Sequence, residues 1–219
     1  MLRQRSLLDR ELNDLRDNIQ QLASMVDTAI DQAVLALQHR DTNLAQQVIM
    51  ADRQINTLRY EIEQKCLTVL ATQQPAAIDL RTVIATIHIA VELERIGDHA
   101  ASIADIVERL QTEPEIDSFH KLPKMAKRAH SMVQQSVAAF IKHDVESARA
   151  IVKRENKMDR NYESLFIETL QKLHSDPAYA ERATYLLLSG RHLERIGDRA
   201  TNIAERVIMM MTGEFVEFS

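Results

Sequence analysis

Apolar side chains recur at intervals of three and four residues along most of this 219-residue chain. That spacing places them on one face of an α-helix. The first stretch shows it over many turns, at Leu8, Leu12, Leu15, Ile19, Leu22, Val26, Ala29, Ala33 and Leu37. Ser6, followed three residues later by Asp9, is the expected N-terminal cap of this helix. The pattern therefore predicts a long first helix that ends near His39.

The next breaks in the pattern define two further helices. Asp41 follows the first break and is expected to cap the second helix, which ends at Gln73-Gln74-Pro75. Pro75 suits the first turn of a third helix, where its missing N–H costs nothing. That third helix is expected to reach about Gln111. Residues 112–123 contain two prolines and several acidic residues, so they form the best candidate for a linker.

The second half of the chain repeats this order. A fourth helix is expected from about Lys124 to Lys142, and Asp144 is expected to cap a fifth. Asp176-Pro177 marks the start of a sixth helix that runs to about Thr212, with Gly213 as its C-terminal cap. Long helices joined by short turns lie antiparallel and bury their apolar faces together. The predicted fold is all-α, with two tandem, similar three-helix bundles at residues 1–113 and 114–219.

A repeated sequence block supports this duplication. The block Leu93–Asp105 reads LERIGDHAASIAD, and Leu193–Glu205 reads LERIGDRATNIAE, with nine of the thirteen positions identical at an offset of 100. On a helix, the core-facing positions of the first copy are expected to be Leu93, Ile96, Ala100, Ile103 and Val107. Gly97 and Gly197 cost about 1 kcal/mol each in mid-helix relative to Ala. Either a close neighbouring helix or space for a bound ion would explain them.

Each block also carries two acidic residues one turn apart, Glu94 with Asp98 and Glu194 with Asp198. Like charges at this spacing repel by a few tenths of a kcal/mol, about the amount by which opposite charges attract. A cation between the two carboxylates would reverse the repulsion. Because hard cations take about six oxygen ligands, a strong site needs further carboxylates from another helix.

Candidate partners for these acids occur on the second and fifth helices. Glu155 and Asp159 are again one turn apart, and an offset of 103 aligns them with Asp52 and Asn56. The same offset aligns Ile55 with Met158 and Asp41 with Asp144. The C-terminal bundle would thus have four carboxylates, whereas the N-terminal bundle would have three and an amide. We expect weaker metal binding in the N-terminal bundle. A solvated acidic face is the alternative interpretation.

Composition restricts the possible classes of protein. Gly and Pro number only 4 each, as expected for few turns and long helices. The formal net charge of -5 argues against a nucleic-acid partner. No stretch approaches the roughly 20 apolar residues of a membrane span, and no apolar signal core is present near Met1. The single cysteine, Cys66, is typical of a reducing compartment, so a cytoplasmic location is expected.

No catalytic motif occurs, so the chain is not expected to be an enzyme. The histidines lack the Glu-x-x-His spacing of di-iron bundles, and His88 and His192 are interpreted as core or surface residues. Two alternatives to a signalling adaptor remain at this point. One is a metal-storage protein or metal-dependent enzyme, and the other is a purely structural scaffold whose acids are a solvated face.

The duplicated block, the segment Asp79-Leu80-Arg81 and the six-helix layout resemble the PhoU family over essentially the whole chain. The resemblance implies two three-helix bundles and dimer formation. It implies acidic pairs that hold metal ions such as iron, zinc, manganese or magnesium, matching Glu94/Asp98, Glu155/Asp159 and Glu194/Asp198 here. It also implies a negative regulator of the phosphate-starvation response that links a phosphate ABC transporter to a sensor histidine kinase of a two-component system.

Overall fold

The computed structural model describes residues 2–111, 113, 121–152 and 155–214, with side chains for 6–111, 113, 121–151 and 157–214. These residues form seven α-helices and one short 3₁₀ helix, and no strand occurs among them. The all-α prediction is therefore confirmed. Within the described ranges, no helix combines the length and apolar character needed to cross a membrane.

The N-terminal half is a bundle of α1 (Leu2–His39), α2 (Thr42–Gln73) and α3 (Ala77–Arg109). The predicted cap at Ser6 is wrong, because α1 already begins at Leu2. Residues 2–5 are Leu, Arg and Gln, which are good helix formers, so the helix extends beyond Ser6 toward the N-terminus. The end of α3 at Arg109 lies two residues before the expected Gln111.

The two Asp caps are confirmed, and they belong to one repeated turn. Asp41 accepts a hydrogen bond from the backbone N–H of Leu44 at 3.0 Å. Asp144 accepts one from the backbone N–H of Ser147, also at 3.0 Å. The residue before each cap, Arg40 or His143, has a positive φ of 51° or 56°. The chain therefore leaves α1 and α4 through the same left-handed residue followed by the same cap.

Pro75 lies before α3 rather than in its first turn, so that prediction is wrong by two residues. Gln74 has φ 47° and ends α2 in the left-handed region. Ala76 is extended and occupies the N-cap position of α3 without a side-chain hydrogen bond. The left-handed Gln74 already turns the chain, which leaves Pro75 in the extended connection between the helices.

The C-terminal half contains α4 (Lys121–Lys142), α5 (Val145–Val152), α6 (Glu155–Ser175) and α7 (Ala180–Thr212). The fourth helix begins three residues before the expected Lys124, because Pro123 is tolerated within a first turn. The expected single fifth helix is described as two helices, α5 and α6, and residues 153–154 lie outside the described part.

Asp176 starts a 3₁₀ helix, η1 (Pro177–Tyr179), rather than the long helix itself. Its side chain accepts a hydrogen bond from the backbone N–H of Ala178 at 3.1 Å, and α7 begins three residues later than Pro177. Tyr179 is fully buried, so packing of this ring tightens the first turn. The predicted end of α7 is confirmed, since Gly213 adopts φ 78° directly after Thr212.

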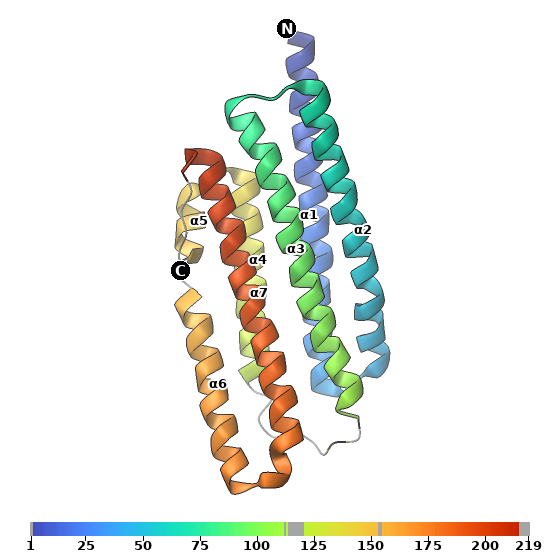
Figure 1. Ribbon diagram of the computed structural model, residues 1–219, viewed down its shortest axis with the longest axis vertical. Helices are drawn as coiled ribbons and strands as arrows, with labels where there is room; N and C mark the ends of the chain where they lie inside the picture. Colours follow the sequence, from blue (N-terminus) through green and yellow to red (C-terminus); the bar gives the residue numbers. More distant parts are fainter. Residues whose placement is uncertain (1, 112, 114–120, 153–154, 215–219) are drawn as a thin grey trace.

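The two halves meet through α3 and α7, which lie side by side in the middle of the molecule, with α2 and α6 toward opposite edges (Figure 1). These central helices are antiparallel: Arg81 near the start of α3 donates from Nε to the carbonyl of Met210 near the end of α7, at 2.8 Å. Because the two helices carry the repeated block, they are related by an approximate twofold axis.

The predicted core face of the repeated block is confirmed. Leu93, Ile96, Ala100, Ile103 and Val107 are all fully buried, as are their counterparts 100 residues later. Each fully buried Leu or Ile contributes about 1.5–3 kcal/mol relative to an exposed one. This seam fixes the rotation of α3 and α7 and therefore the direction in which their acidic residues point.

Candidate functional site

Each mid-helix glycine of the repeated block accommodates a side chain from a neighbouring helix. A Cβ added to Gly97 would lie 3.1 Å from Cδ1 of Ile55 on α2. A Cβ added to Gly197 would lie 3.3 Å from Cγ of Met158 on α6. The structure therefore supports close helix approach as the reason for both glycines. It also places Ile55 and Met158 in equivalent positions, as the offset of 103 predicts.

The N-terminal acidic residues come together beside Gly97. Burial raises the pKa of Asp52, and the charge of Asp98 raises it further, whereas Asn56 lies beside Asp52 and partly offsets the rise. Burial likewise raises the pKa of Glu94, followed by repulsion from Asp98. One oxygen of Asp52, Oδ1, is buried and has no hydrogen-bond partner. All four predicted residues of this bundle therefore lie in one cluster, which we call the N-terminal acidic cluster (Asp52, Asn56, Glu94 and Asp98).

A cation that the sequence reasoning missed, Arg59 of α2, lies against this cluster. Its Nη2 is 3.8 Å from Oε1 of Glu94, and its Nη1 is 2.9 Å from Oε2 of Glu63. The guanidinium lowers the pKa values of both Glu94 and Asp98 and so opposes the effect of burial. Arg59 follows Asp52 by seven residues, or two helical turns. That spacing places both side chains on the same face of α2, so the sequence did contain a signal for this arginine.

The C-terminal acidic cluster comprises Asp159, Glu194 and Asp198 within the described side chains; the side chain of Glu155 lies outside them. Glu194 is buried, with only 8% of its surface exposed. Burial raises the pKa values of Glu194 and Asp198, and Asp159 adds repulsion to both. The predicted meeting of Asp159 with the pair on α7 is thus observed.

Two arginines of α7 neutralise part of this charge. Arg191, which the sequence reasoning missed, forms an ion pair with Glu194. Arg195 lies 3.2 Å from Oδ2 of Asp198 through its Nη1, one helical turn away. The guanidinium carbon of Arg191 also lies 5.8 Å from the ring centre of Tyr162 on α6. Arg191 precedes Glu194 by three residues, so the spacing on the helix was again an available signal.

In each repeat an arginine lies beside the repeated glutamate, but the two repeats provide it from different helices. In the N-terminal cluster Arg59 comes from α2, and the residue 103 positions later on α6 is Tyr162. In the C-terminal cluster Arg191 comes from α7, and the residue 100 positions earlier on α3 is Val91. Besides the repeated Arg95 or Arg195, each repeated glutamate thus has one further guanidinium nearby, although the sequence position that provides it has changed. Charge neutralisation is a shared property of both clusters.

The donor chemistry of the clusters fits a hard metal ion, because it consists of carboxylate and amide oxygens. In their observed positions, however, the described side chains contain no group of three or more Asp, Glu, His or Cys residues placed to hold a metal ion. The unpartnered Oδ1 of Asp52 and the raised pKa values are the observations that favour a cation there. Metal binding by these residues stays a prediction.

The central interface holds a pair of histidines. Nδ1 of His99 on α3 lies 3.3 Å from Nδ1 of His192 on α7, and the ring centres are 5.5 Å apart. Burial lowers the pKa of both rings, and that of His99 falls to about 4 because His192, and then Arg199 and Arg195, add to the effect of burial. His88, in contrast, is exposed. No sequence pattern predicts the pair, because its members lie 93 residues apart on different helices.

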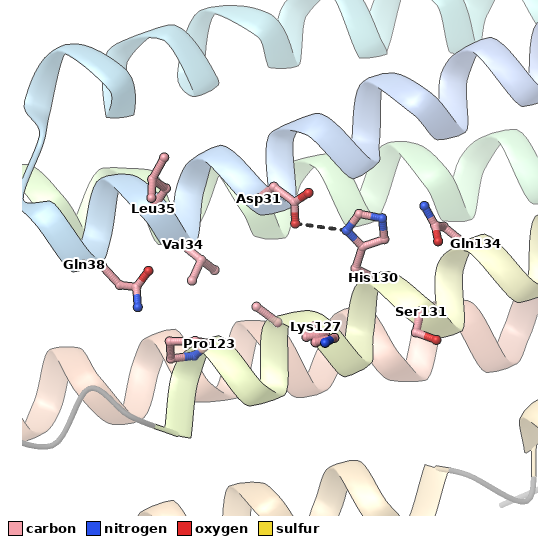
Figure 2. Close-up of a pocket in the computed structure, with 10 residues that line it drawn as sticks. Asp31, Val34, Leu35, Gln38, Pro123, Lys127, His130, Ser131 and Gln134 are labelled. Carbon is pink, nitrogen blue, oxygen red and sulfur yellow. Dashed lines mark hydrogen bonds and ion pairs between the residues drawn. The ribbon is translucent and has the colours of Figure 1, made fainter.

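A hollow of about 550 Å³ lies between α1 and α4. Figure 2 shows Asp31 of α1 reaching His130 of α4 across it; Oδ1 and Nδ1 are 2.9 Å apart. Nε2 of His130 also lies 3.6 Å from Oδ2 of Asp27. These contacts join the two halves of the molecule behind the central helices, and none of these three residues was singled out from the sequence.

Comparison with known proteins shows which family this chain is similar to. The sequence matches the family model described as PhoU domain twice, over residues 8–107 and 122–207. A protein from Clostridium acetobutylicum, described as a phosphate-specific transport system accessory protein PhoU homolog, is 33% identical over 216 residues, or 98% of this chain and 99% of the relative.

Solved structures agree with the sequence matches. The crystal structure of PhoU from Pseudomonas aeruginosa has a TM-score of 0.89 at 34% identity, covering 94% of this chain and 99% of that chain. The crystal structure of the phosphate transport system regulatory protein PhoU from Streptococcus pneumoniae also has a TM-score of 0.89, at 33% identity, covering 96% and 100% of the two chains. The similarity thus extends over both repeats.

Proposed function

The chain belongs to the PhoU family, and on this premise we propose that it is a negative regulator of the phosphate-starvation response. In this role it is an accessory to a phosphate-specific transport system and couples the phosphate ABC transporter to a sensor histidine kinase. The observation that carries the proposal is the match to transport accessory and regulatory proteins along the full length of both repeats. The protein acts through its binding surfaces, in the cytoplasm, without a catalytic step.

Exposed apolar side chains on the outer helices support binding to other proteins. On α6, Phe166, Ile167 and Leu170 form a patch within about one turn, with exposed fractions of 42%, 49% and 37%. On α2, Leu67 is 53% exposed and stands 103 positions before Leu170. Grouped apolar residues on a helix surface are typical of sites where a partner helix or domain binds.

Direct binding tests this role. The purified chain is titrated against the transporter ATPase and against the cytoplasmic part of the sensor kinase, with binding followed by calorimetry. We expect binding to both, and we expect Phe166→Ser plus Ile167→Ser to weaken at least one of them about tenfold or more. The control Glu163→Gln plus Gln171→Ala changes exposed polar residues of the same helix and should bind normally. The adaptor role would be contradicted if the chain failed to bind the transporter ATPase, the kinase, or both.

The same proposal includes a homodimer. Light scattering on the wild-type chain measures the mass directly, and a value of twice the 25.0 kDa chain is expected. If the apolar patch on α6 forms that interface, the Phe166→Ser plus Ile167→Ser variant should be monomeric. If instead the variant remains dimeric while kinase or transporter binding is lost, the patch serves those partners. A monomeric wild-type chain would contradict the dimer.

We propose further that the acidic clusters bind a divalent or trivalent ion such as iron, zinc, manganese or magnesium. Asp159, Glu194 and Asp198 would hold it in the C-terminal bundle together with Glu155, and the N-terminal acidic cluster would bind more weakly. The ion would neutralise carboxylates whose pKa values are raised by burial and mutual repulsion. Elemental analysis checks this: Glu194→Ala plus Asp198→Ala should lower the metal content, and an unchanged content would refute the assignment.

A further inference from the structure

The helix α4 carries a row of basic residues and no acidic residue at all. Lys127 and Arg128 follow Lys124 by three and four positions, so the three residues share one face of the helix. Ser131 continues the row three residues beyond Arg128. The other long helices mix the two signs of charge, and the acidic chain as a whole has a formal net charge of -5. This row is therefore a local exception to the charge of the molecule.

The arrangement is unfavourable for the isolated helix in two ways. Like charges three or four residues apart repel by a few tenths of a kcal/mol per pair. Lys124 also lies in the first turn of α4, where the helix dipole favours negative rather than positive side chains. Both effects would be reversed by an anion placed along the row.

The row lines a groove of about 370 Å³ between α4 and α6. Lys157 of α6 lines the opposite side, and Met132 and Ser131 also contribute to its wall. Nη1 of Arg128 donates to the backbone carbonyl of Lys157 at 2.9 Å, which holds the guanidinium in the wall. Two helices thus direct four cations toward one hollow, which we call the basic groove (Lys124, Lys127, Arg128, Ser131, Met132 and Lys157).

Within the described part of the chain, no carboxylate forms an ion pair with Lys124, Lys127 or Lys157. The acidic residues that do reach α4 contact other side chains. Glu168 pairs with Lys121 at 2.5 Å, and Asp31 contacts His130 on the side of α4 that faces α1. Among the described side chains, most of the positive charge in the groove therefore lacks an acidic counterpart.

We propose that the basic groove binds an acidic segment of a partner protein in an extended conformation. The row from Lys124 to Ser131 rises about 10 Å along the helix axis at 1.5 Å per residue. An extended peptide covers that length in about three residues at 3.3–3.6 Å each. Three of the four cations are exposed lysines, which are mobile point charges suited to successive carboxylates. A built pocket for one small anion would need fixed, buried donors, whereas the one cation held by a hydrogen bond here, Arg128, is only partly buried.

A labelled acidic peptide tests the proposal, which stands independently of the regulatory role. The probe is a fluorescein-labelled octapeptide of alternating Asp and Glu, titrated with the full chain at low salt and followed by fluorescence anisotropy. The groove variant is Lys124→Gln, Lys127→Gln and Lys157→Gln. We expect a Kd at least about tenfold higher for this variant, and weaker wild-type binding as salt increases.

The matched control removes three exposed cations from the N-terminal bundle, Arg10→Gln, Arg53→Gln and Lys65→Gln, and should bind as the wild type does. Circular dichroism checks that both variants are folded. Equal affinities of the groove variant and the control would overturn the proposal, because binding would then reflect net charge alone. It would equally be overturned if inorganic phosphate at millimolar concentration, or phosphatidylglycerol vesicles, bound through these lysines while the peptide did not.

Discussion

Ile55 packs directly onto Gly97, with its Cδ1 only 3.1 Å from where a Cβ at residue 97 would lie. At the equivalent contact, Met158 lies against Gly197 with Cγ at 3.3 Å. The two neighbours differ in stiffness. Both side chains are almost fully buried, but isoleucine is branched at Cβ, whereas methionine is unbranched and adapts to its surroundings. The same substitution should therefore have different effects in the two repeats.

We expect Gly97→Ala to lower the free energy of unfolding by about 1–2 kcal/mol, since overpacking outweighs the gain in helix propensity. Gly197→Ala should change it by less than about 1 kcal/mol, because Met158 can move. Urea unfolding of both variants measures the difference. In an Ile55→Ala background the cost of Gly97→Ala should disappear. If Gly197→Ala proved the more damaging, the packing explanation would be wrong.

The histidine pair predicts how stability depends on pH. The approximate twofold axis relates the His99–His192 contact to the ion pair between Glu92 and Arg199, whose atoms are 3.4 Å apart. The pKa of His99 falls to about 4, below the ordinary value of 6.5, because the ring is buried beside other cations. The unfolded chain therefore binds a proton first as the pH falls. Stability is complete above about 6.5 and decreases between 6.5 and 4.

Thermal unfolding at several pH values checks this prediction. The wild-type Tm should decrease over that interval, and His99→Gln should decrease less because one of the two rings no longer titrates. His39→Gln is the matched control, since His39 is an exposed histidine at the end of α1, outside the contact between α3 and α7. Identical pH profiles for wild type and His99→Gln would show that other groups account for the acid sensitivity.

Arg59 offers a test of charge balance in the N-terminal acidic cluster. Replacing it by Gln leaves Arg95 as the nearby guanidinium for Glu94 and for the exposed Asp98, so we expect a loss of stability of about 0.5–1.5 kcal/mol. The same change should strengthen binding of Mn²⁺, because a competing cation is removed. Metal titration by calorimetry and urea unfolding provide the two measurements.

The control for Arg59→Gln is Arg53→Gln, which removes an exposed cation from the same helix and should alter neither property. If Arg59→Gln reduced stability but left Mn²⁺ affinity unchanged, the arginine would be structural, and the proposal of a metal in this cluster would lose its support.

Sequence patterns predicted the features that depend on local chemistry. The caps at Asp41 and Asp144 need only an Asp before a helix. The buried seam that begins at Leu93 needs only helical spacing. The equivalence of Ile55 and Met158 followed from the internal alignment of the two repeats, although their contacts with Gly97 and Gly197 were not predicted. In each case the information lies within one helix or is duplicated in the other half.

The features that were missed depend on packing between helices. His99 and His192 are in contact only because α3 and α7 pack with one particular register along their axes. No residue spacing within one helix predicts that register. The split start of α7 depends on the buried ring of Tyr179. Arg59 and Arg191 were overlooked for a different reason, because the repeats exchange the position that supplies the guanidinium and a direct alignment hides their common role.

The measurement that tests the central claim most directly is deletion of the gene in its native host, followed by an alkaline phosphatase reporter assay in phosphate-rich medium. A negative regulator of the phosphate-starvation response predicts high, constitutive reporter activity that a plasmid copy of the wild-type gene restores to the repressed level. Reporter activity that stays as low as in the parent strain, in a host without a second copy of the gene, would contradict that role.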